Sequence, residues 1–338
     1  MSGAVRVRPR MRDVATEAGV SVKTVSRVVN RDPVVAAATA ARVQAAIRRL
    51  GFRRDEMARA LRTGGQSRML GLVIKDLANP FYSAIARGVE EVMRGRSELV
   101  ITGSSDEDPV RERELALQLC ERRVDGLLIV PSGDDHSYLL PELELGMQVV
   151  FIDRLAEGID ADTVLLDNVG GSRAGVEYLL GLGHRRIAMV GDDVTIFTAR
   201  ERRSGFCEAL AAAGIEPDPA LVRIGAHDTA AAAEVTRELL ALPNPPTALF
   251  AGNNRIATGV LRALALTGRE LALVSFDDLE LADLLSMPVT AIAYDAAELG
   301  RCAAQLLARR LDGDTGPPEL VVLPTTLIPR GAPEAAAA

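Results

Sequence analysis

Cysteine, histidine and aromatic residues are scarce in this chain of 338 residues, which has three cysteines, three histidines and no tryptophan. The cysteines are isolated in helix-like segments, so we expect reduced thiols and not a disulfide framework. The histidines lie far apart and have no partner at the spacing of a metal site, so no metal is expected. These residues are Cys120, Cys207, Cys302, His136, His184 and His227.

Long apolar runs are also absent, and no stretch reaches the length that a membrane span requires. The N-terminus is basic but no apolar stretch follows it, so we expect no secretory signal, no membrane partner and a cytoplasmic location. No phosphate-loop lysine motif, nucleophile elbow or metal cluster is present, which argues against an enzyme and against a bound cofactor. Gly170, Gly171 and Gly175 echo a dinucleotide-binding fingerprint only weakly, and they favour close packing or a turn at the start of a helix.

The chain has a basic N-terminal segment, residues 1–65, which we call the head, and an acidic remainder. Residues 1–65 hold 14 basic and 5 acidic side chains, a net charge of +9, and the whole chain is at −7, so residues 66–338 carry −16. Such asymmetry is typical of a nucleic-acid-binding module joined to another domain. The chain is long enough for two or three domains.

The basic head contains a pattern of two short helices joined by a tight turn, over residues 12–30. Val14 and Ala18 are four residues apart and share a face of the first helix. Gly19 can take the positive φ of the turn, and Ser21 is a good N-cap for the second helix. The pattern predicts a helix-turn-helix, although an amphipathic hairpin in any globular protein can look the same.

The second of these helices has two opposite stripes. Its apolar stripe is formed by Val25, Val28 and Val29, and its exposed stripe by Lys23, Arg27 and Asn30. Ammonium, guanidinium and amide groups suit base edges and phosphates in the major groove of duplex DNA. The charge of the head favours this interpretation over that of a solvated hairpin.

Beyond the head, a helix is expected at 39–50 and a flexible linker at 64–67, and apolar strands alternate with amphipathic helices from residue 70 onward. Such alternation predicts parallel sheets with helices on both faces, arranged as one barrel or as two doubly wound halves. Polar clusters after several strands then lie at the carboxyl edges, where ligands bind in open sheets. The expected strands are 70–74, 99–102, 126–130, 149–152, 164–166, 187–190, 248–250, 271–275 and 320–323, and the expected helices are 81–94, 110–122, 169–182, 199–213, 229–242, 253–266 and 296–311.

Several segments resemble the lactose-repressor (LacI/GalR) family of bacterial transcription regulators. The family's N-terminal signature is matched by DVA at 13–15, AGVS at 18–21 and TVSRVVN at 24–30, and this match is highly specific. NPFY at 79–82, RVDGL at 123–127, LGHRRI at 182–187, ARERRSGF at 199–206 and FDD at 276–278 follow in the family's order. The resemblance covers nearly all of residues 10–330.

The resemblance implies an α/β fold class with an N-terminal all-α helix-turn-helix domain and a periplasmic-binding-protein-like core of two doubly wound parallel-sheet subdomains. The DNA-binding domain is expected at 10–54, a hinge helix and linker at 55–67, an effector-binding and dimerisation core at 68–330 and a disordered tail at 331–338. The N-subdomain of the core takes residues 68–165 and 295–323, and the C-subdomain takes 166–293. Crossovers are expected near Leu166, Tyr294 and Leu323.

The resemblance also implies how the chain meets DNA, as a homodimer on a pseudo-palindromic operator. In the major groove, Val22, Lys23 and Arg27 are expected at base edges, and Ser21, Thr24 and Asn30 at phosphates. Residues 56–62 resemble a hinge helix in which a paired leucine enters the minor groove and bends the DNA. Leu61 matches that leucine, with Ala58 beside it. The alternative for Leu61 is packing within its own dimer.

In the core, the resemblance places a small polar effector, expected to be a carbohydrate, between the subdomains. The implied contacts are Asn79, Phe81, Asp153, Arg202, Phe206, Asn253 and Asp277. Carboxylates, a guanidinium and amides form bidentate hydrogen bonds with vicinal hydroxyls, and an aromatic ring offers an apolar wall to a sugar face.

Other roles stay open for some of these residues: Asp277 can cap a helix at 279–285, Arg202 can form a surface ion pair, and Phe206 can be an ordinary core residue. Asn254 and Tyr294 stand where relatives commonly have Asp and Gln, which leaves the ligand class open. The expected function is that of a sequence-specific repressor whose operator affinity is controlled by a ligand. The alternative is a sugar-binding or sugar-processing protein with no specific operator.

Overall fold

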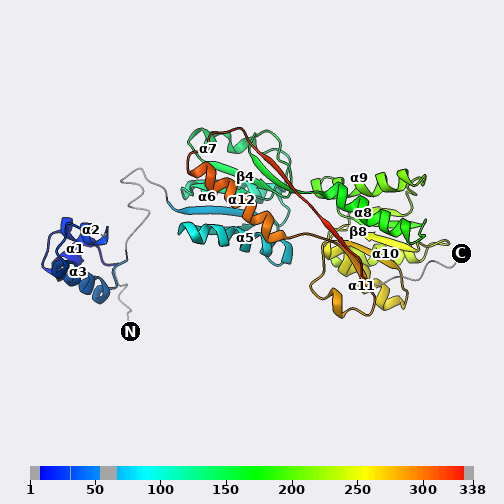
Figure 1. Ribbon diagram of the computed structural model, residues 1–338, viewed down its shortest axis with the longest axis horizontal. Coiled ribbons are helices and arrows are strands. Elements are labelled where there is room, and N and C mark those ends of the chain that lie inside the picture. Colours follow the sequence, from blue (N-terminus) through cyan, green and yellow to red (C-terminus); the bar gives the residue numbers. More distant parts are fainter. Residues whose placement is uncertain (1–7, 31, 54–66, 331–338) are drawn as a thin grey trace. The chain divides into compact units, whose positions relative to one another are not determined.

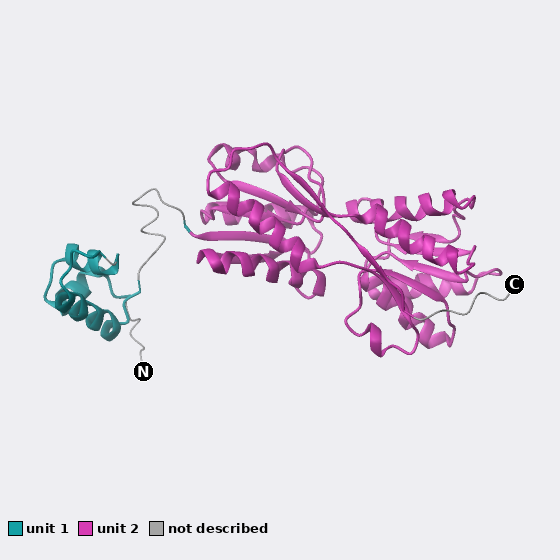
Figure 2. Ribbon diagram, in the orientation of Figure 1, with its two compact units in different colours: residues 1–67 teal, residues 68–338 magenta. Residues whose placement is uncertain are grey.

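The computed structural model describes residues 8–30, 32–53 and 67–330. The chain divides into two compact units, residues 1–67 and residues 68–338 (Figure 2). Within the described part of the chain, no helix is both long enough and apolar enough to cross a membrane. Ala58, Leu61 and the tail expected at 331–338 lie outside the described residues.

The first unit is a three-helix head made of α1 (Met11–Ala18), α2 (Val22–Val29) and α3 (Ala37–Leu50). Val14, Val25 and Val43, one from each helix, are fully buried and form its core. Gly19 ends α1 with φ 62°, a left-handed conformation that favours glycine. The hydroxyl of Ser21 accepts a hydrogen bond from the backbone N–H of Thr24 at 3.1 Å and so caps α2. The expected helix-turn-helix is confirmed.

The second unit contains two six-stranded sheets. The first sheet has the order β11-β5-β4-β3-β1-β2 with all pairs parallel, and the second has the order β12-β10-β9-β8-β6-β7. The strands of the first sheet are β1 (Met69–Ile74), β2 (Leu99–Ser104), β3 (Gly126–Ile129), β4 (Gln148–Ile152), β5 (Asp162–Leu166) and β11 (Leu320–Leu323). Those of the second are β6 (Ile187–Gly191), β7 (Val222–Ile224), β8 (Ala248–Ala251), β9 (Ala272–Phe276), β10 (Val289–Ala293) and β12 (Thr326–Ile328).

Helices cover both faces of each sheet. This confirms the doubly wound fold and excludes the alternative arrangement as a single barrel. One face of the first sheet is covered by α5 (Pro80–Arg96) and α12 (Ala296–Leu311). The other face is covered by α6 (Pro109–Glu121) and the short α7 (Leu140–Glu144). One face of the second sheet is covered by α8 (Asn168–Gly181) and α9 (Phe197–Ala212), and the other by α10 (Thr229–Leu240) and α11 (Asn254–Thr267). In Figure 1 the orange α12, late in the chain, lies among the cyan and green elements of the first half.

The chain passes between the two halves three times, at Asp167, at Tyr294 with Asp295, and at Pro324 with Thr325. The third passage is a direct strand-to-strand step without a helix. The chain therefore enters the second sheet in the opposite direction, and β12 pairs with β10 antiparallel. The expected parallel sheets are confirmed, and the edge strand β12 is the one antiparallel strand among the described residues.

Candidate functional site

A cleft lies between the two halves of the second unit, where loops after the carboxyl ends of strands from both sheets face each other. Its free space, open mouth included, is about 690 Å³. Residues after β1 and β4 line it from the first half, and residues after β6, β8 and β9 line it from the second.

Two buried aspartates project into the cleft from the two halves. Asp153 follows β4 and is 2% exposed, and Asp277 follows β9 and is 8% exposed. Burial raises the pKa of both carboxyls above their usual range. Asp277 accepts hydrogen bonds from the backbone N–H of Asn254 at 3.0 Å and from the hydroxyl of Tyr294. Within the described residues, Asp153 Oδ1 is buried and has no hydrogen-bond partner.

Arg202 supplies a buried cation to the same cleft. Its Nε donates to Asn168 Oδ1 at 2.8 Å, and its Nη1 donates to the carbonyl of Gly252 at 2.7 Å. The guanidinium carbon lies 3.7 Å from the centre of the Phe276 ring, a cation–π contact. The expectation of a surface ion pair for Arg202 is wrong, because the residue is only 6% exposed and is held by an amide, a carbonyl and a ring.

Aromatic rings form one wall of the cleft. Phe81 contacts Tyr82 edge-on with ring centres 4.8 Å apart, and it contacts Tyr294 with centres 5.8 Å apart. Tyr294 in turn lies 6.1 Å from Phe276. Burial raises the pKa of Tyr294 well above its usual value, so its hydroxyl stays protonated and donates to Asp277. The cleft therefore offers both an apolar ring surface and buried polar groups.

Three asparagines position the helix starts at the cleft. Asn79 caps α5 by accepting from the backbone N–H of Phe81 at 3.1 Å, and Asn253 caps α11 by accepting from that of Ile256 at 2.9 Å. Asn254 Nδ2 donates to Asn79 Oδ1 at 2.9 Å, a hydrogen bond between the two halves. Because both caps use the side-chain oxygen, the side-chain NH₂ groups of Asn79 and Asn253 remain as donors at this place.

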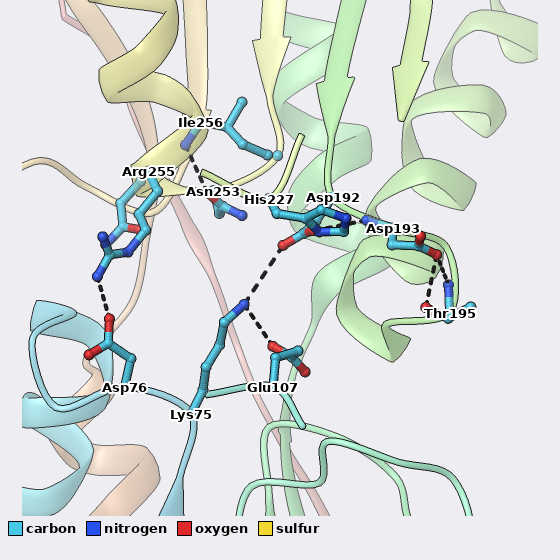
Figure 3. A network of polar contacts seen from close by, with 12 residues as sticks. Lys75, Asp76, Glu107, Asp192, Asp193, Thr195, His227, Asn253, Arg255 and Ile256 are labelled. Atoms are coloured by element: carbon cyan, nitrogen blue, oxygen red, sulfur yellow. Dashed lines mark hydrogen bonds and ion pairs between the residues drawn. The ribbon is translucent and has the colours of Figure 1, made fainter. Parts of the chain in front are cut away.

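Charged residues lie nearer the mouth of the cleft (Figure 3). Lys75 Nζ lies 2.7 Å from Glu107 Oε2 and 3.9 Å from Asp192 Oδ2 in the other half. Arg255 pairs across the cleft with Asp76. Asp192 also accepts from His227 Nδ1 at 2.7 Å.

The last charged residue of the lining is Arg154, which is buried beside Asp153. Its guanidinium pairs with Glu107 and donates to the carbonyl of Pro131 at 2.7 Å. Burial disfavours a charged Glu107, yet Arg154 and Lys75 hold the pKa of this carboxyl below its usual range.

Six of the seven residues expected at the effector line this cleft, namely Asn79, Phe81, Asp153, Arg202, Asn253 and Asp277. Phe206 does not, and this expectation is corrected: its side chain is fully buried in the core of the second half, with its ring 6.1 Å from that of Phe250. The helix expected at 279–285 is reduced to the turn Ala282–Leu284, so Asp277 caps nothing there. Sequence reasoning missed the lining residues Lys75, Asp76, Tyr82, Arg154, Asp192, His227 and Arg255.

The missed residues carried a usable signal. Lys75 and Asp76 directly follow β1, Asp192 directly follows β6, and Arg154 is the neighbour of Asp153. A rule that takes every polar residue directly after a strand would have included them. His227 and Arg255 lie in loops or helix starts whose position depends on the rest of the fold.

On the head, the residues expected at DNA lie on one helix and are accessible. Val22, Lys23 and Arg27 are exposed on α2, and Val22 is 44% exposed despite its apolar side chain. Ser21 and Asn30 are exposed caps at the two ends of α2, and Thr24 is half-buried. Arg27 Nε lies 3.7 Å from Asp32 Oδ2, a loose surface pair that leaves the guanidinium free to turn toward another anion.

Comparisons with known proteins agree with both units. Residues 10–55 match a family model described as bacterial regulatory proteins, lacI family, and residues 176–332 match one described as a periplasmic binding protein-like domain. The ribose operon repressor of Escherichia coli (strain K12) is 32% identical over 330 residues, which cover 95% of this chain and 98% of that protein.

Solved structures extend the comparison over the same length. The lac repressor dimer bound to operator and an anti-inducer matches with a TM-score of 0.84 and 26% identity, covering 98% of this chain and 100% of that one. The transcriptional regulator CelR in complex with cellobiose matches with a TM-score of 0.71 and 31% identity, covering 96% and 100%. With a helix-turn-helix head, a two-sheet core and a relative of this identity over nearly the whole length, the chain belongs to the lacI family of bacterial regulatory proteins and is a DNA-binding transcriptional regulator.

Proposed function

We propose that this protein is a repressor that acts as a homodimer in the cytoplasm. Its affinity for a pseudo-palindromic operator is controlled by a small neutral polyhydroxyl ligand that binds in the cleft. The observation that carries the ligand class is the pair of buried carboxyl groups, Asp153 and Asp277, which line the same cleft as the aromatic rings of Phe81 and Tyr294. The buried Asp153 Oδ1 lacks a donor among the described residues, and a sugar hydroxyl is such a donor.

The charges of the cleft favour a neutral ligand over an anionic one. Of its four basic residues, Lys75 and Arg154 pair with Glu107, and Arg255 pairs with Asp76. The fourth, Arg202, directs two of its nitrogens to Asn168 and Gly252. A phosphate would have to displace a carboxylate from Lys75, Arg154 or Arg255. One relative, from Pseudomonas putida, is in complex with fructose 1-phosphate, so sugar phosphates belong in the test.

At the DNA, α2 is proposed to enter the major groove with Val22, Lys23 and Arg27 at base edges and Ser21, Thr24 and Asn30 at phosphates. Ala58 and Leu61, outside the described residues, are proposed to enter the minor groove from the paired hinge. Support for the dimer comes from the lac repressor, solved as a dimer on its operator, and from leucines exposed on the second half of the core. These are Leu266, Leu281 and Leu284, at 77%, 64% and 81% exposed.

Two linked measurements test this function. Thermal unfolding is followed with a panel of monosaccharides, disaccharides, nucleosides and sugar phosphates, because a ligand that binds only the folded state raises Tm. Operator sequences are selected from random duplexes, and affinity is measured by fluorescence anisotropy at about 150 mM salt with and without the ligand. We expect at least about a 10³-fold preference for the selected sequence and a change of affinity on ligand addition. A protein that binds a sugar but shows no preferred duplex is instead the alternative, a sugar-binding protein without an operator.

A further inference from the structure

Two ion pairs join the two halves of the core among the residues that line the cleft (Figure 3). Arg255 pairs with Asp76, and Lys75 Nζ lies 3.9 Å from Asp192 Oδ2. We call them the mouth pairs. The side chains of Lys75, Asp76 and Arg255 are 25–40% exposed, whereas Asp153, Arg202 and Asp277 are buried, and Asp192 is as buried as these three. The Arg255–Asp76 pair and the Lys75 ammonium therefore lie nearer to solvent than the inner polar groups.

The two pairs are side by side because of how the chain leaves the strands. Lys75 and Asp76 are consecutive residues after β1 of the first half. Their partners come from two separate segments of the second half, Asp192 after β6 and Arg255 in the first turn of α11. In Figure 3 both pairs run in the same direction across the gap between the ribbons of the two halves.

Each mouth pair is held in place by further bonds. Asp76 Oδ1 accepts from the backbone N–H of Ala78 at 2.8 Å, and Lys75 is anchored by Glu107 at 2.7 Å. Asp192 Oδ1 accepts from His227 Nδ1 at 2.7 Å and from the backbone N–H of Asp193 at 2.9 Å. A ligand group that enters between the partners must separate Arg255 from Asp76 and Lys75 from the buried Asp192, and separating opposite charges at a partly buried place is unfavourable.

From this arrangement, and resting on the proposed function, we propose that the mouth pairs are specificity determinants that restrict the effector to a ligand of monosaccharide size, enclosed entirely behind them. A disaccharide whose first ring occupies the inner site must extend its second ring through the space that the pairs fill. The second ring then separates Arg255 from Asp76 and Lys75 from Asp192. A single ring leaves both pairs intact.

Calorimetric titration of the full-length protein tests this with monosaccharides from the panel, each compared with a disaccharide that contains it. The measured quantity is the ratio of the two Kd values. In the unchanged protein the disaccharide should bind at least about tenfold more weakly. Arg255→Ser should lower this ratio several-fold, and Lys75→Ser combined with Arg255→Ser should lower it further. Arg255→Lys, which keeps the charge, should retain most of the ratio. Arg203→Ser removes an exposed arginine of α9 away from the cleft and is the matched control.

The outcomes separate this inference from the proposed function. A disaccharide that binds the unchanged protein as tightly as its monosaccharide overturns the role of the mouth pairs and leaves the carbohydrate proposal standing. A ratio that stays at its original value in both serine variants overturns it as well. If no carbohydrate of either length binds, the proposed ligand class fails and the inference fails with it.

Discussion

Asp153 and Asp277 occupy equivalent positions in the two halves of the core. Each follows the third strand of its sheet order, β4 and β9, and each is in the left-handed region, with φ 70° and 78°. The backbone N–H of Asp153 donates to Val164 at 2.7 Å, and that of Asp277 donates to Ile292 at 3.1 Å. Two copies of one strand-end geometry thus aim two carboxylates into a shared cleft. Aspartate and asparagine tolerate this backbone conformation better than most residues do.

The first prediction concerns the stability of Asp153. Because burial raises its pKa in the folded state, the folded protein binds more protons than the unfolded chain from about pH 4 up to that raised value. Stability therefore falls as pH rises through this window, and the ionised carboxylate is destabilising at pH 7. Asp153→Asn should raise the Tm of the ligand-free protein at pH 7, flatten its decline with pH and abolish the Tm shift caused by ligand.

The neighbour of Asp277 provides the control with the opposite sign. A hydrogen bond from Arg330 lowers the pKa of Asp278, so its charge stabilises the fold above the ordinary pKa and that stability is lost as pH falls. Asp278→Asn should lower Tm at pH 7. A lower Tm for Asp153→Asn at that pH, or an unchanged ligand response, would contradict the role given to Asp153.

The second prediction concerns Asn254, which forms a hydrogen bond between the two halves. The amide of Asn254 donates to Asn79 Oδ1, an oxygen that already accepts from Phe81. Asn254→Asp replaces this donor by an oxygen and leaves two acceptors facing each other. We expect effector affinity to fall by about 1–3 kcal/mol, roughly 5- to 150-fold, measured by calorimetry. Hydrogen exchange in the first turn of α11 should become faster.

Asn79→Asp is the informative partner for this variant. Asn79 uses only its oxygen in both bonds, so an aspartate there keeps both acceptors. Exchange in the first turn of α11 should stay slow. Equal hydrogen-exchange rates in the two variants would mean that the hydrogen bond between Asn254 and Asn79 does not hold the cleft closed.

The third prediction concerns close packing in α8. A Cβ added at Gly175 would lie 2.7 Å from Ile292 Cδ1 and 2.9 Å from Val274 Cγ1. Gly175→Ala should therefore lower the free energy of unfolding by about 1–3 kcal/mol in urea titrations. Gly181, in the same helix, has no atom within 4 Å of an added Cβ, so Gly181→Ala should be neutral or raise stability by up to about 1 kcal/mol. Similar effects of the two substitutions would refute the packing explanation.

The fourth prediction concerns base reading by Arg27. Arg27→Ala should weaken binding to the selected operator by about 1–3 kcal/mol and relax the preference at one base position. The head should remain folded, because the exposed pair with Asp32 contributes little. Arg49→Ala removes an exposed arginine of α3 and is the control for general charge. A uniform loss on all duplexes in anisotropy assays would assign Arg27 to the phosphates instead.

Local patterns predicted most of the elements. The valines of α2 repeat at helical spacing. The expected strands and helices beyond residue 70 are present to within a few residues, except the helix at 279–285, which is reduced to the turn Ala282–Leu284. The strands β7, β10 and β12 and the short α7 were not predicted. β10 carries alanines of low strand propensity and is a strand because it pairs with β9 on one side and β12 on the other.

The residues of the candidate site were also predicted only in part from local patterns. Arg202 and Phe206 lie four apart on α9, and the sequence offers no reason to separate them. In the structure Arg202 reaches the cleft, whereas Phe206 fills the core beneath the second sheet. Asn79 and Asn254 are 175 residues apart, and Asp76 and Arg255 are 179 apart. No local pattern predicts such pairs, because only the folding of two halves toward each other brings them together.

The amino-acid sequence by itself determined the head, the succession of strands and helices, the charge asymmetry and the residue types at the strand ends. Those depend on spacing within one turn, one strand or one loop, over which backbone geometry and side-chain periodicity act directly. Tertiary structure decided which strand ends meet, which polar groups lose water and which charges pair across the mouth. These depend on contacts between segments distant in the chain, and their strength comes from burial that no single segment possesses alone.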